Sequence, residues 1–418
     1  MMRWRSGDPN ALRVAAARFV SRAGGEAAFF VGIWGKAAYE FDASPRQQAL
    51  LMGSLGVFSL FGAAAAGVLI DRYDPRRVLM WSEILFVPSA LALVLPSTIE
   101  QMTAAVAVLA VCSAAVLTAV GSFPAFLTDD SKRLQRINSL VEAAGSLAFV
   151  AGPALGAVIV RFATLDLIFV LDAATSVVAV AVVAGVRLRA VTRKGRRPMF
   201  RDLREGFRFS FASRPLRLYI GMGAGVWISF GAFSALEPLF YRDVVGTGPE
   251  ALGWVNAIFG MGILGGSILL GRLSSRLVTA RSLVLGCLGS GLGAVFYTIT
   301  DDLLVVCMGA VYWGVILGAL FPLMRTLIQL DAPAHLAGRV MGTTNVSNHV
   351  GELLPLTFVP SLAAAFGVQP VLVGSGACMI AIASLAYIEG AQVDRVRKGA
   401  RIEPEVVVPA DEPITPNP

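Results

Sequence analysis

Long apolar segments alternate with short polar connections along most of this chain. Each segment is about as long as an α-helix must be to cross a lipid bilayer, roughly 20 residues. Six lie near residues 13–35, 47–70, 78–96, 103–127, 139–160 and 165–186, and six more lie near 216–240, 251–273, 281–299, 303–324, 340–365 and 370–389. The pattern predicts an all-α polytopic membrane protein with twelve transmembrane helices in two six-helix halves.

The polar stretches divide the chain into four parts. They are an N-terminal half over residues 1–187, a basic linker over 188–215, a C-terminal half over 216–390 and a tail over 391–418. In the linker, four apolar residues recur at helical spacing with arginines between them: Phe200, Leu203, Phe207 and Phe211. This spacing predicts an amphipathic helix on the cytoplasmic membrane surface. The tail is rich in proline, so we expect it to be disordered.

Composition supports membrane insertion and changes how the charge is interpreted. Apolar residues make up 56% and charged residues 15% of the 418 positions, which excludes an ordinary water-soluble globule. The formal charge of +7 could indicate nucleic-acid binding in a soluble protein. Here, however, about 29 of the 35 Lys and Arg residues lie in one alternate set of loops and in the two termini, as the positive-inside rule requires. We therefore expect no nucleic-acid partner and place both termini in the cytoplasm.

The abundance of arginine, alanine and glycine is typical of a GC-rich bacterial genome, and we assign the chain to a bacterial plasma (inner) membrane. Its four cysteines stand singly in apolar segments, without partners at ligand spacing. The sequence shows no nucleotide-binding fingerprint, metal-ligand cluster or catalytic-triad spacing. We therefore expect neither an enzyme nor an ATP-driven pump, no cofactor, no metal, and a monomer.

The connection between the second and third segments carries the most specific motif. It reads G-V-L-I-D-R-Y-D-P-R-R and contains Gly67, Asp71, Arg72, Arg76 and Arg77. The second half repeats the arrangement of glycine, arginine pair and return to an apolar segment as G-R-L-S-S-R-L-V-T-A-R over residues 271–281. A repeat of this length indicates a duplicated half. Taken alone, the arginines could equally be ordinary positive-inside anchors.

This connection resembles the loop signature of the major facilitator superfamily. Asp74 replaces the glycine that the signature usually has, a departure also common in the superfamily's macrolide-efflux and enterobactin-exporter branch. The same branch is resembled by S-R-A-G-G-E in the first segment, G-S-F-P-A-F in the fourth, R-I-N-S-L before the fifth, E-G-F-R-F in the linker and Q-L-D-A-P-A-H-L-A-G-R-V-M-G before the eleventh. The resemblance covers nearly the whole chain. It implies the major facilitator fold, with a central cavity lined mainly by helices 1, 4, 7 and 10 and transport by alternating access.

The fifth segment, G-S-L-A-F-V-A-G-P-A-L-G-A, combines small residues that let helix backbones touch with a proline that bends the helix. The residues concerned are Gly145, Gly152, Pro153 and Gly156. Gly262 and Gly266 of the eighth segment are the expected mate across the interface between the halves. The segment resembles the G-P-x-x-G-G motif of antiporter-type exporters, except that Ala157 replaces the last glycine. General helix packing without directional meaning is the alternative, so the motif favours export without establishing it.

Ionisable side chains inside a membrane segment cost roughly 2.5 to 3.5 kcal/mol each, so every one needs a partner or a wet cavity. Arg22 and Glu26 lie four positions apart in the first segment and can neutralise each other. Glu26 is our first candidate for a proton-coupling acid, because burial and Arg22 act in opposite directions on its protonation. His349 and Glu352 in the eleventh segment are further candidates. The alternatives are a permanent ion pair in the first segment and a packing role for His349.

The other intramembrane acids have simpler explanations. Glu83 and Asp172 fall in the third and sixth segments, which lie outside the cavity in the superfamily, and we expect helix caps or helix-to-helix bonds for them. Glu142 lies near the cytoplasmic end of the fifth segment and can bond loop arginines, while Glu237 lies near the outer end of the seventh and could be interfacial. The fourth segment lacks the arginine of many proton-coupled members, so their coupling mechanism does not transfer directly.

The candidate cavity-lining residues are mostly aromatic. Aromatic rings suit a bulky amphiphilic or cationic solute through apolar contact and their ring quadrupoles. The set is Phe29, Phe30 and Trp34 in the first segment, Trp227, Phe230, Phe233 and Glu237 in the seventh, Tyr312 and Trp313 in the tenth, and Asn345 in the eleventh. For any one of these aromatic rings the alternative is lipid-facing bulk or helix packing.

These features predict a secondary active transporter that exports lipophilic small molecules, such as drug-like compounds or siderophores, in exchange for protons. Its partners are then a small-molecule substrate, protons and membrane lipids. A lipid or lysolipid translocator is the runner-up, because an apolar cavity with lateral access has much the same composition. A non-transporting membrane sensor or scaffold is the alternative from another class. Solute flux and proton movement in proteoliposomes separate a transporter from a scaffold.

The one-sided repeat generates a testable hypothesis about Asp71, whose counterpart in the second half is Ser275. If the second helix ends beside the cytoplasmic start of the eleventh, near Arg339, the Asp71 carboxylate meets a positive helix terminus, a contact worth about 0.3 to 1 kcal/mol. Such a latch closes the cytoplasmic side. We expect Asp71→Asn to favour the inward-open state and reduce transport at normal expression, whereas Ser275→Ala does little. Equal changes in the cysteine accessibility of the cytoplasmic cavity contradict the latch.

Overall fold

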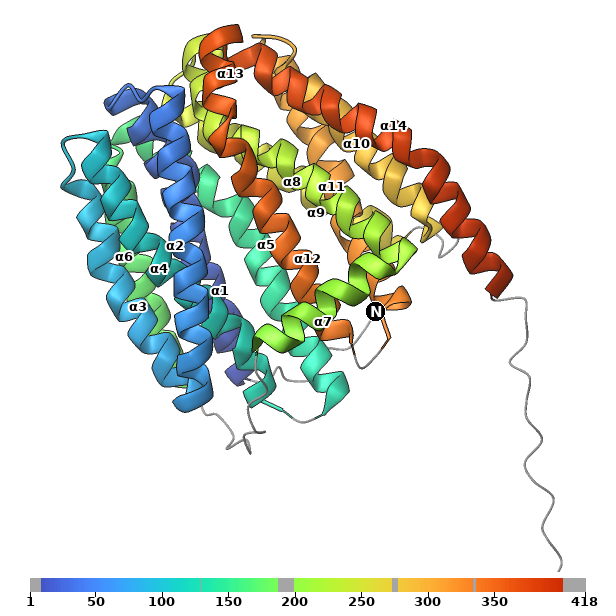
Figure 1. Cartoon of the computed structure of the whole chain (residues 1–418). Helices are drawn as coiled ribbons and strands as arrows, with labels where there is room; N and C mark the ends of the chain where they lie inside the picture. The colour runs from blue at the N-terminus through green and yellow to red at the C-terminus, as the bar shows by residue number, and fades with distance from the viewer. Residues whose placement is uncertain (1–8, 129, 187–198, 273–276, 334–335, 401–418) are drawn as a thin grey trace, which may run out of the picture.

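The structure is a computed structural model that describes residues 9–128, 130–186, 199–272, 277–333 and 336–400, and its regular structure in these ranges is helical. The first half contains α1 (Pro9–Ala27), α2 (Pro45–Arg72), α3 (Pro75–Leu91), α4 (Ile99–Ser122), α5 (Ser131–Phe162) and α6 (Asp166–Ala184). The second contains α8 (Arg214–Phe240), α9 (Pro249–Arg272), α10 (Ala280–Thr298), α11 (Leu303–Asp331), α12 (Ala337–Leu353), α13 (Val359–Phe366) and α14 (Val368–Ala400). Figure 1 shows the two halves side by side, with α7 (Met199–Ala212) between them along the chain. The predicted all-helical fold is confirmed.

Among the described residues, ten helices are long and apolar enough to cross a membrane, and α12 with α13 makes an eleventh crossing that is bent by 40°. The sequence predicted twelve. The difference is α1, in which Arg13, Arg18, Arg22 and Glu26 lower the hydropathy. This helix nevertheless continues through two π-helical segments, η1 (Ala28–Ile33) and η2 (Lys36–Glu40), and packs against both α5 and α6. π-helical turns are rare and often mark functional sites.

Polar side chains define where several of these helices begin. Ser44 and Gln47 form a reciprocal capping box at the start of α2, because each side chain reaches the other residue's backbone. Asp74 accepts from the Arg76 N–H at the start of α3, and Asp130 caps α5 in the same way. Such caps satisfy N–H groups that have no partner within the helix, so the connections between the helices can be short.

The two halves repeat one close packing contact. In the first half, a Cβ on Gly62 of α2 would overlap the backbone of Val111 in α4, and in the second, a Cβ on Gly266 of α9 would overlap the carbonyl of Val315 in α11. Because α2 and α9 occupy the same place in the two halves, the contact supports the predicted duplication. Glycine allows these helix backbones to touch, which is how helices associate where water provides no hydrophobic driving force.

A buried lysine joins the continuation of α1 to its neighbours within the first half. The Lys36 side chain is only 3% exposed, and its ammonium lies 2.6 Å from Asp166 at the start of α6. It also donates to the backbone oxygens of Leu93 and Val94 in η3 (Ala92–Val94) after α3. A charge this deep requires several partners, so these bonds hold α1, α3 and α6 together at one end of the bundle.

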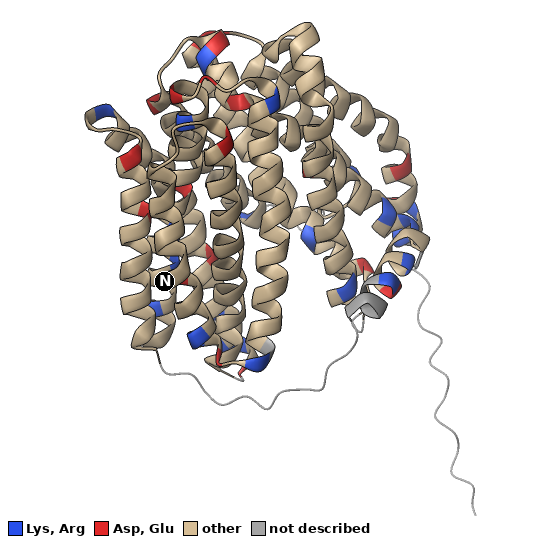
Figure 2. Cartoon of the chain, turned by 60° about the vertical axis from the view of Figure 1, so that its left-hand side comes forward, with Lys and Arg blue, Asp and Glu red and all other residues tan. Residues whose placement is uncertain are grey.

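We call this end the far end, and the end at which α2 joins α3 the arginine-rich end. Figure 2 colours the charged residues of both ends. Helix α7 lies at the arginine-rich end and packs on the start of α12, where Glu205 forms an ion pair of 2.6 Å with Arg339. Residues 199–212, which form α7, belong to the predicted amphipathic linker. Residues 188–198 of that linker lie outside the described residues.

The predicted boundary of the tail is wrong by ten residues. Helix α14 continues to Ala400, because Asp394 accepts from the backbone N–H groups of Ala280 and Arg281 at the start of α10. Arg397 adds an ion pair of 3.1 Å with Asp331 at the end of α11. These tertiary contacts extend the helix beyond the last apolar residue of the segment. Residues 401–418, also predicted to be disordered, lie outside the described residues.

Two adjacent glycines test how much the close contact contributes to stability. Gly266→Ala places a methyl group against the Val315 backbone, and we expect it to lower the unfolding free energy by about 1 to 3 kcal/mol. A Cβ on Gly265 meets no atom within 4 Å, so Gly265→Ala should be neutral or stabilise the helix by about 0.5 to 1 kcal/mol. Thermal unfolding of the purified protein in detergent measures both. Equal unfolding temperatures for the two variants contradict the contact.

Candidate functional site

Two cavities lie inside the helix bundle. The larger, of about 470 Å³, is lined by residues of both halves, and this volume is within the range of small-molecule sites. The smaller, of about 380 Å³, lies mainly among helices of the first half. Arg22, Glu26 and Phe29 border both cavities. The segment around Glu26 therefore separates one space from the other.

Aromatic rings form most of the wall of the larger cavity. In the first half, Phe30 makes edge contacts with Phe29 at 4.9 Å and with Phe149 at 5.6 Å between ring centroids. In the second, Phe230 of α8 stacks on Trp313 of α11 at 5.1 Å. Rings that hold one another in this way leave flat apolar faces toward the cavity. The π-helical η1 contributes Phe29 and Phe30 to this wall.

Eight of the ten predicted lining residues border the larger cavity: Phe29, Phe30, Trp34, Trp227, Phe230, Phe233, Glu237 and Trp313. Tyr312 does not, because it is 38% exposed on the outside of α11 with its ring against Phe296. Asn345 is exposed on α12 and borders neither cavity. The prediction missed four aromatic residues of the wall, Phe149, Phe259, Tyr297 and Phe321. The sequence places each of these rings on one face of its helix, but only the packing of the helices decides which face turns toward the cavity.

Arg22 and Glu26 form the predicted ion pair on α1. The guanidinium Nε donates to Glu26 Oε1 at 2.8 Å, and the two side chains are 32% and 15% exposed. The glycines of α5 lie directly behind this pair, since a Cβ on Gly152 would lie 2.6 Å from the Glu26 Cβ. A partly wet ion pair at the border of two cavities can be opened by adding a proton to the carboxylate.

The small-residue face of α5 has a different partner from the predicted one. Gly145, Gly152 and Gly156 face α1, whereas Gly262 and Gly266 of α9 pack on α11 within their own half. The contact across the halves is made instead by Gly253 of α9, at which a Cβ would lie 2.6 Å from the Ala157 Cβ of α5. Pro153 also belongs to this contact, through its carbonyl oxygen. The spacing of small residues predicted close packing but not the rotation of the helix.

Glu237 is the second acid of the larger cavity, and its surroundings are more apolar. The residue is 7% exposed, accepts a hydrogen bond of 2.6 Å from the Tyr297 hydroxyl and one of 3.3 Å from the Asn256 amide. Tyr297 also bonds Tyr241 at 2.5 Å, which extends the network toward the far end. The prediction of an interfacial Glu237 is therefore wrong: the carboxyl lies inside the protein, where α9 and α10 supply its donors.

His349 and Glu352 lie together on α12, with His349 Nδ1 3.7 Å from Glu352 Oε2. Glu352 borders the larger cavity and His349 the smaller one, and the two side chains are 36% and 55% exposed. The smaller cavity is also bordered by Glu83 and Asp172, neither of which borders the larger cavity between the halves. Among the described residues, no group of three His, Cys, Asp or Glu side chains is placed to hold a metal ion.

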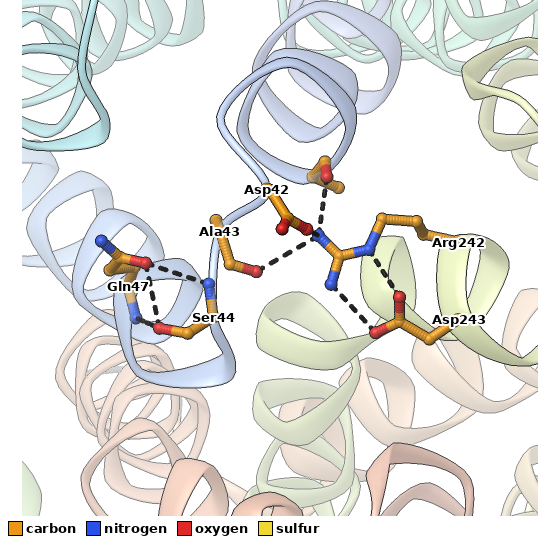
Figure 3. Close-up of polar contacts among 7 residues, drawn as sticks. Asp42, Ala43, Ser44, Gln47, Arg242 and Asp243 are labelled. Carbon is orange, nitrogen blue, oxygen red and sulfur yellow. Dashed lines mark hydrogen bonds and ion pairs between the residues drawn. The ribbon is translucent and has the colours of Figure 1, made fainter.

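The two halves are fastened together at the far end by Arg242, in η5 (Tyr241–Val245) after α8 (Figure 3). Its guanidinium donates to the Ala38 carbonyl at 2.7 Å and forms ion pairs with Asp42 at 2.7 Å and Asp243 at 2.6 Å. Asp42 has a φ of +46°, in the left-handed region that residues other than glycine rarely adopt. One arginine of the second half therefore holds the loop that joins η2 to α2 in the first half.

At the arginine-rich end, one of the predicted latch residues makes a contact within its own half. Arg76 donates to the Val186 carbonyl at the end of α6 at 3.1 Å, while Arg72 and Arg77 are exposed. A Cβ on Gly67 meets no atom within 4 Å. The side chain of Asp71 and all of Ser275 lie outside the described residues, so the latch stays a prediction. Its expected partner Arg339 is paired with Glu205 of α7 in this structure.

Known proteins of similar sequence and structure agree with this fold. The model of the Major Facilitator Superfamily matches residues 14–354. The uncharacterized MFS-type transporter YfiS of Bacillus subtilis (strain 168) is 24% identical over 379 residues, which cover 87% of this chain and 88% of the relative. The multidrug efflux pump Tap of Mycolicibacterium fortuitum is 27% identical over 337 residues, covering 74% and 79%. A solved structure of a peptide transporter POT with sulfate has a TM-score of 0.75 at 13% identity, over 94% of this chain and 97% of that one.

The contacts of Arg242 generate a prediction about the balance between conformations. Arg242→Ala removes two charged pairs and a bond to Ala38, and hydrogen bonds to charged groups are worth about 1.5 to 3 kcal/mol. We expect the population open at the far end to rise about tenfold. The readout is labelling of Ser234→Cys, which lines the larger cavity, by a membrane-impermeant thiol reagent applied to intact cells. The four native cysteines are replaced beforehand.

The matched control is Arg46→Ala, which removes an exposed arginine at the same end of the molecule. Labelling of Ser234→Cys should not change in this background. Equal labelling rates in the Arg242→Ala and Arg46→Ala backgrounds show that Arg242 does not hold the far end closed.

Proposed function

The chain belongs to the Major Facilitator Superfamily, and on this premise we propose that it is a proton-coupled exporter of lipophilic small molecules in a bacterial plasma membrane. The observation that carries the proposal is one cavity with two properties. Its wall is aromatic and comes from both halves, and it includes the Arg22–Glu26 ion pair. Apolar faces bind a lipophilic solute without strict geometry, while the ion pair responds to a proton.

The substrate that fits this cavity best is amphiphilic and carries a positive charge. Aromatic rings attract a cation through their quadrupoles, and Glu237 offers a carboxyl group among them. The multidrug efflux pump Tap is a relative at 27% identity, which supports efflux of drug-like compounds. The motifs quoted above support the macrolide-efflux and enterobactin-exporter branch, to which siderophore export also belongs.

The coupling we propose uses Glu26 as the acid that takes up the proton. When the cavity opens outward, Glu26 accepts a proton and releases Arg22. When it opens inward, loss of the proton restores the pair and favours binding of a cationic solute. Each step favours one of two conformations, so proton and substrate compete without having to touch. His349 and Glu352 on α12 are the next candidates for the coupling groups.

The direction of opening follows from the proposed topology. With both termini and the arginine-rich end in the cytoplasm, the Arg242 contact lies on the external side and holds that side closed. Transport then requires the Arg242 contact to break while the arginine-rich end closes. Asp71 is our proposal for the latch that forms at that point. The packing of α5 on α1 and α9 supports the antiporter-type motif as part of this movement.

The test of this proposal is Glu26→Gln in proteoliposomes, with the fluorescent lipophilic cation ethidium as the probe. We expect the variant to keep ethidium binding and exchange, to lose accumulation against a gradient by at least about tenfold, and to lose the pH dependence of binding. Glu100→Gln, at an exposed acid on the first turn of α4, is the matched control and should pump like the unmodified protein.

Uphill pumping by Glu26→Gln under an imposed pH gradient moves the coupling acid elsewhere, with Glu352 the next residue to replace. Transport of a fluorescent lysolipid but not of ethidium by the unmodified protein supports the lipid-translocator alternative. Absence of both solute flux and proton movement supports the scaffold.

A further inference from the structure

Four buried side-chain oxygen atoms on α3 and α6 have no hydrogen-bond partner among the described residues. They are Asp172 Oδ1, Asp172 Oδ2, Glu83 Oε2 and Ser176 Oγ. Asp172 and Ser176 are fully buried, and Glu83 is 2% exposed. Burying a carboxylate without donors is far more costly than any single helix contact can offset. The Ser176 hydroxyl can donate to Glu83, but no described side chain donates to the two oxygens of Asp172, so something other than a protein side chain must satisfy them.

The four atoms belong to the neighbouring helices α3 and α6, and two of their three residues border one cavity. Glu83 on α3 and Asp172 on α6 both line the smaller cavity, and the other oxygen of Glu83 accepts a bond of 3.0 Å from Ser21 of α1. A Cβ on Gly24 of α1 would lie 3.0 Å from Asp172 Oδ1. The carboxyl of Asp172 thus lies directly on the α1 backbone, two residues before Glu26.

The charges that face this space do not balance. Arg22 and Glu26 neutralise each other, which leaves Arg18 of α1 to oppose both Glu83 and Asp172. His349 of α12 borders the same cavity and is 55% exposed, and the exposed Glu142 of α5 acts on Arg18 from the solvent side. With His349 neutral, one negative charge inside the protein remains without a partner. One monovalent positive charge would complete the site.

We propose that Asp172 and Glu83 form a second proton-binding site, separate from Glu26, that binds one exchangeable proton in the first half. This site deepens the proposed function and rests on it, because proton-coupled transport is the process that would use such a proton. On uptake, one O–H bond forms at a carboxylate oxygen of Asp172 with a proton from water in the smaller cavity. On release, the same bond breaks and the proton returns to that water.

A proton fits the site better than a metal cation. Hard cations such as Ca²⁺ and Mg²⁺ require about six or more oxygen ligands, and here three side chains offer only four unpartnered oxygens. A proton needs only one oxygen to hold it and one acceptor. The neutral Asp172 has an O–H to donate, and Glu83 Oε2 and Ser176 Oγ are acceptors without a bond.

The position of Asp172 gives the proton a route of influence on the ion pair. Asp172 and Thr175 of α6 contact Gly24 of α1 so closely that a side chain at this position would overlap them. The close approach of α6 to α1 at this point therefore depends on the glycine. An ionised Asp172 requires water or Arg18 as a donor, and either one needs α1 and α6 to separate locally. Arg22 and Glu26 lie on this same turn of α1. A change in the protonation of Asp172 therefore changes the position of the Arg22–Glu26 ion pair.

The experiment is an infrared pH titration of the full chain in lipid vesicles, which detects the carbonyl stretch of protonated carboxyl groups without any substrate. We expect a band from a buried protonated acid that is lost in Asp172→Asn. The band should remain in Glu26→Gln and in Asp301→Asn, whose acid is exposed on the connection before α11. Because this band is independent of transport, failure of Glu26 as the coupling acid leaves the test of Asp172 intact.

Two results overturn the second site. One is an unchanged band in Asp172→Asn. The other is the absence of such a band together with stabilisation by sodium. In that case the unfolding temperature is higher in sodium chloride than in choline chloride for the unmodified protein but not for Asp172→Asn, and the site binds sodium. If Asp172→Asn does not fold, Glu83→Gln is measured in its place. Removing that neighbouring carboxyl should shift the pH dependence of the band, and an unshifted band contradicts the shared site.

Discussion

Charge inside the hydrocarbon layer has to be satisfied within the protein, and this constraint organises the first half of the molecule. The cost of roughly 2.5 to 3.5 kcal/mol for each ionisable residue applies unless partners or water are supplied. α1 and its continuation carry most of that charge, and their charged side chains are satisfied in different ways. Lys36 is paired with Asp166, and Arg22 with Glu26. The helices around α1 therefore fit its charged groups as closely as its apolar ones.

A second constraint separates what is rigid from what can move. Within each half, helix backbones touch at glycines such as Gly62 and Gly266, and these contacts leave little freedom. Between the halves, the contacts are of two kinds. Near the far end, α5 and α9 touch at Gly253, and Arg242 bonds the loop before α2. Bonds from one side chain at a wet surface are easier to exchange than interlocked backbones, so we expect a movement of one half against the other to begin at Arg242.

The cavity between the halves combines two kinds of chemistry that are usually separate. Its aromatic wall is dry and tolerant of shape, because ring faces make contact with many solutes. Four acids border the cavity, Glu26, Glu142, Glu237 and Glu352, and the surroundings of Glu26 and Glu237 differ. Glu26 has an arginine partner and some water, whereas Glu237 has hydroxyl and amide donors and almost no water. These surroundings support our proposal that Glu26 exchanges the proton, and we expect Glu237 to stay inside the protein as a recognition point for the substrate.

Local spacing in the sequence was enough to predict the apolar segments, their duplication, the Arg22–Glu26 pair and most of the aromatic wall. Each of these depends on helix periodicity, which places residues four apart on one face. Rotation of each helix about its axis and contacts between distant segments have no such local signal. Only the tertiary structure shows that Asp172 and Glu83 border the same cavity. It also shows that the glycines of α5 face α1 and that Arg242 forms an ion pair with Asp42. It also extended α14 past its apolar segment, because the bonds of Asp394 and Arg397 come from helices more than sixty residues away.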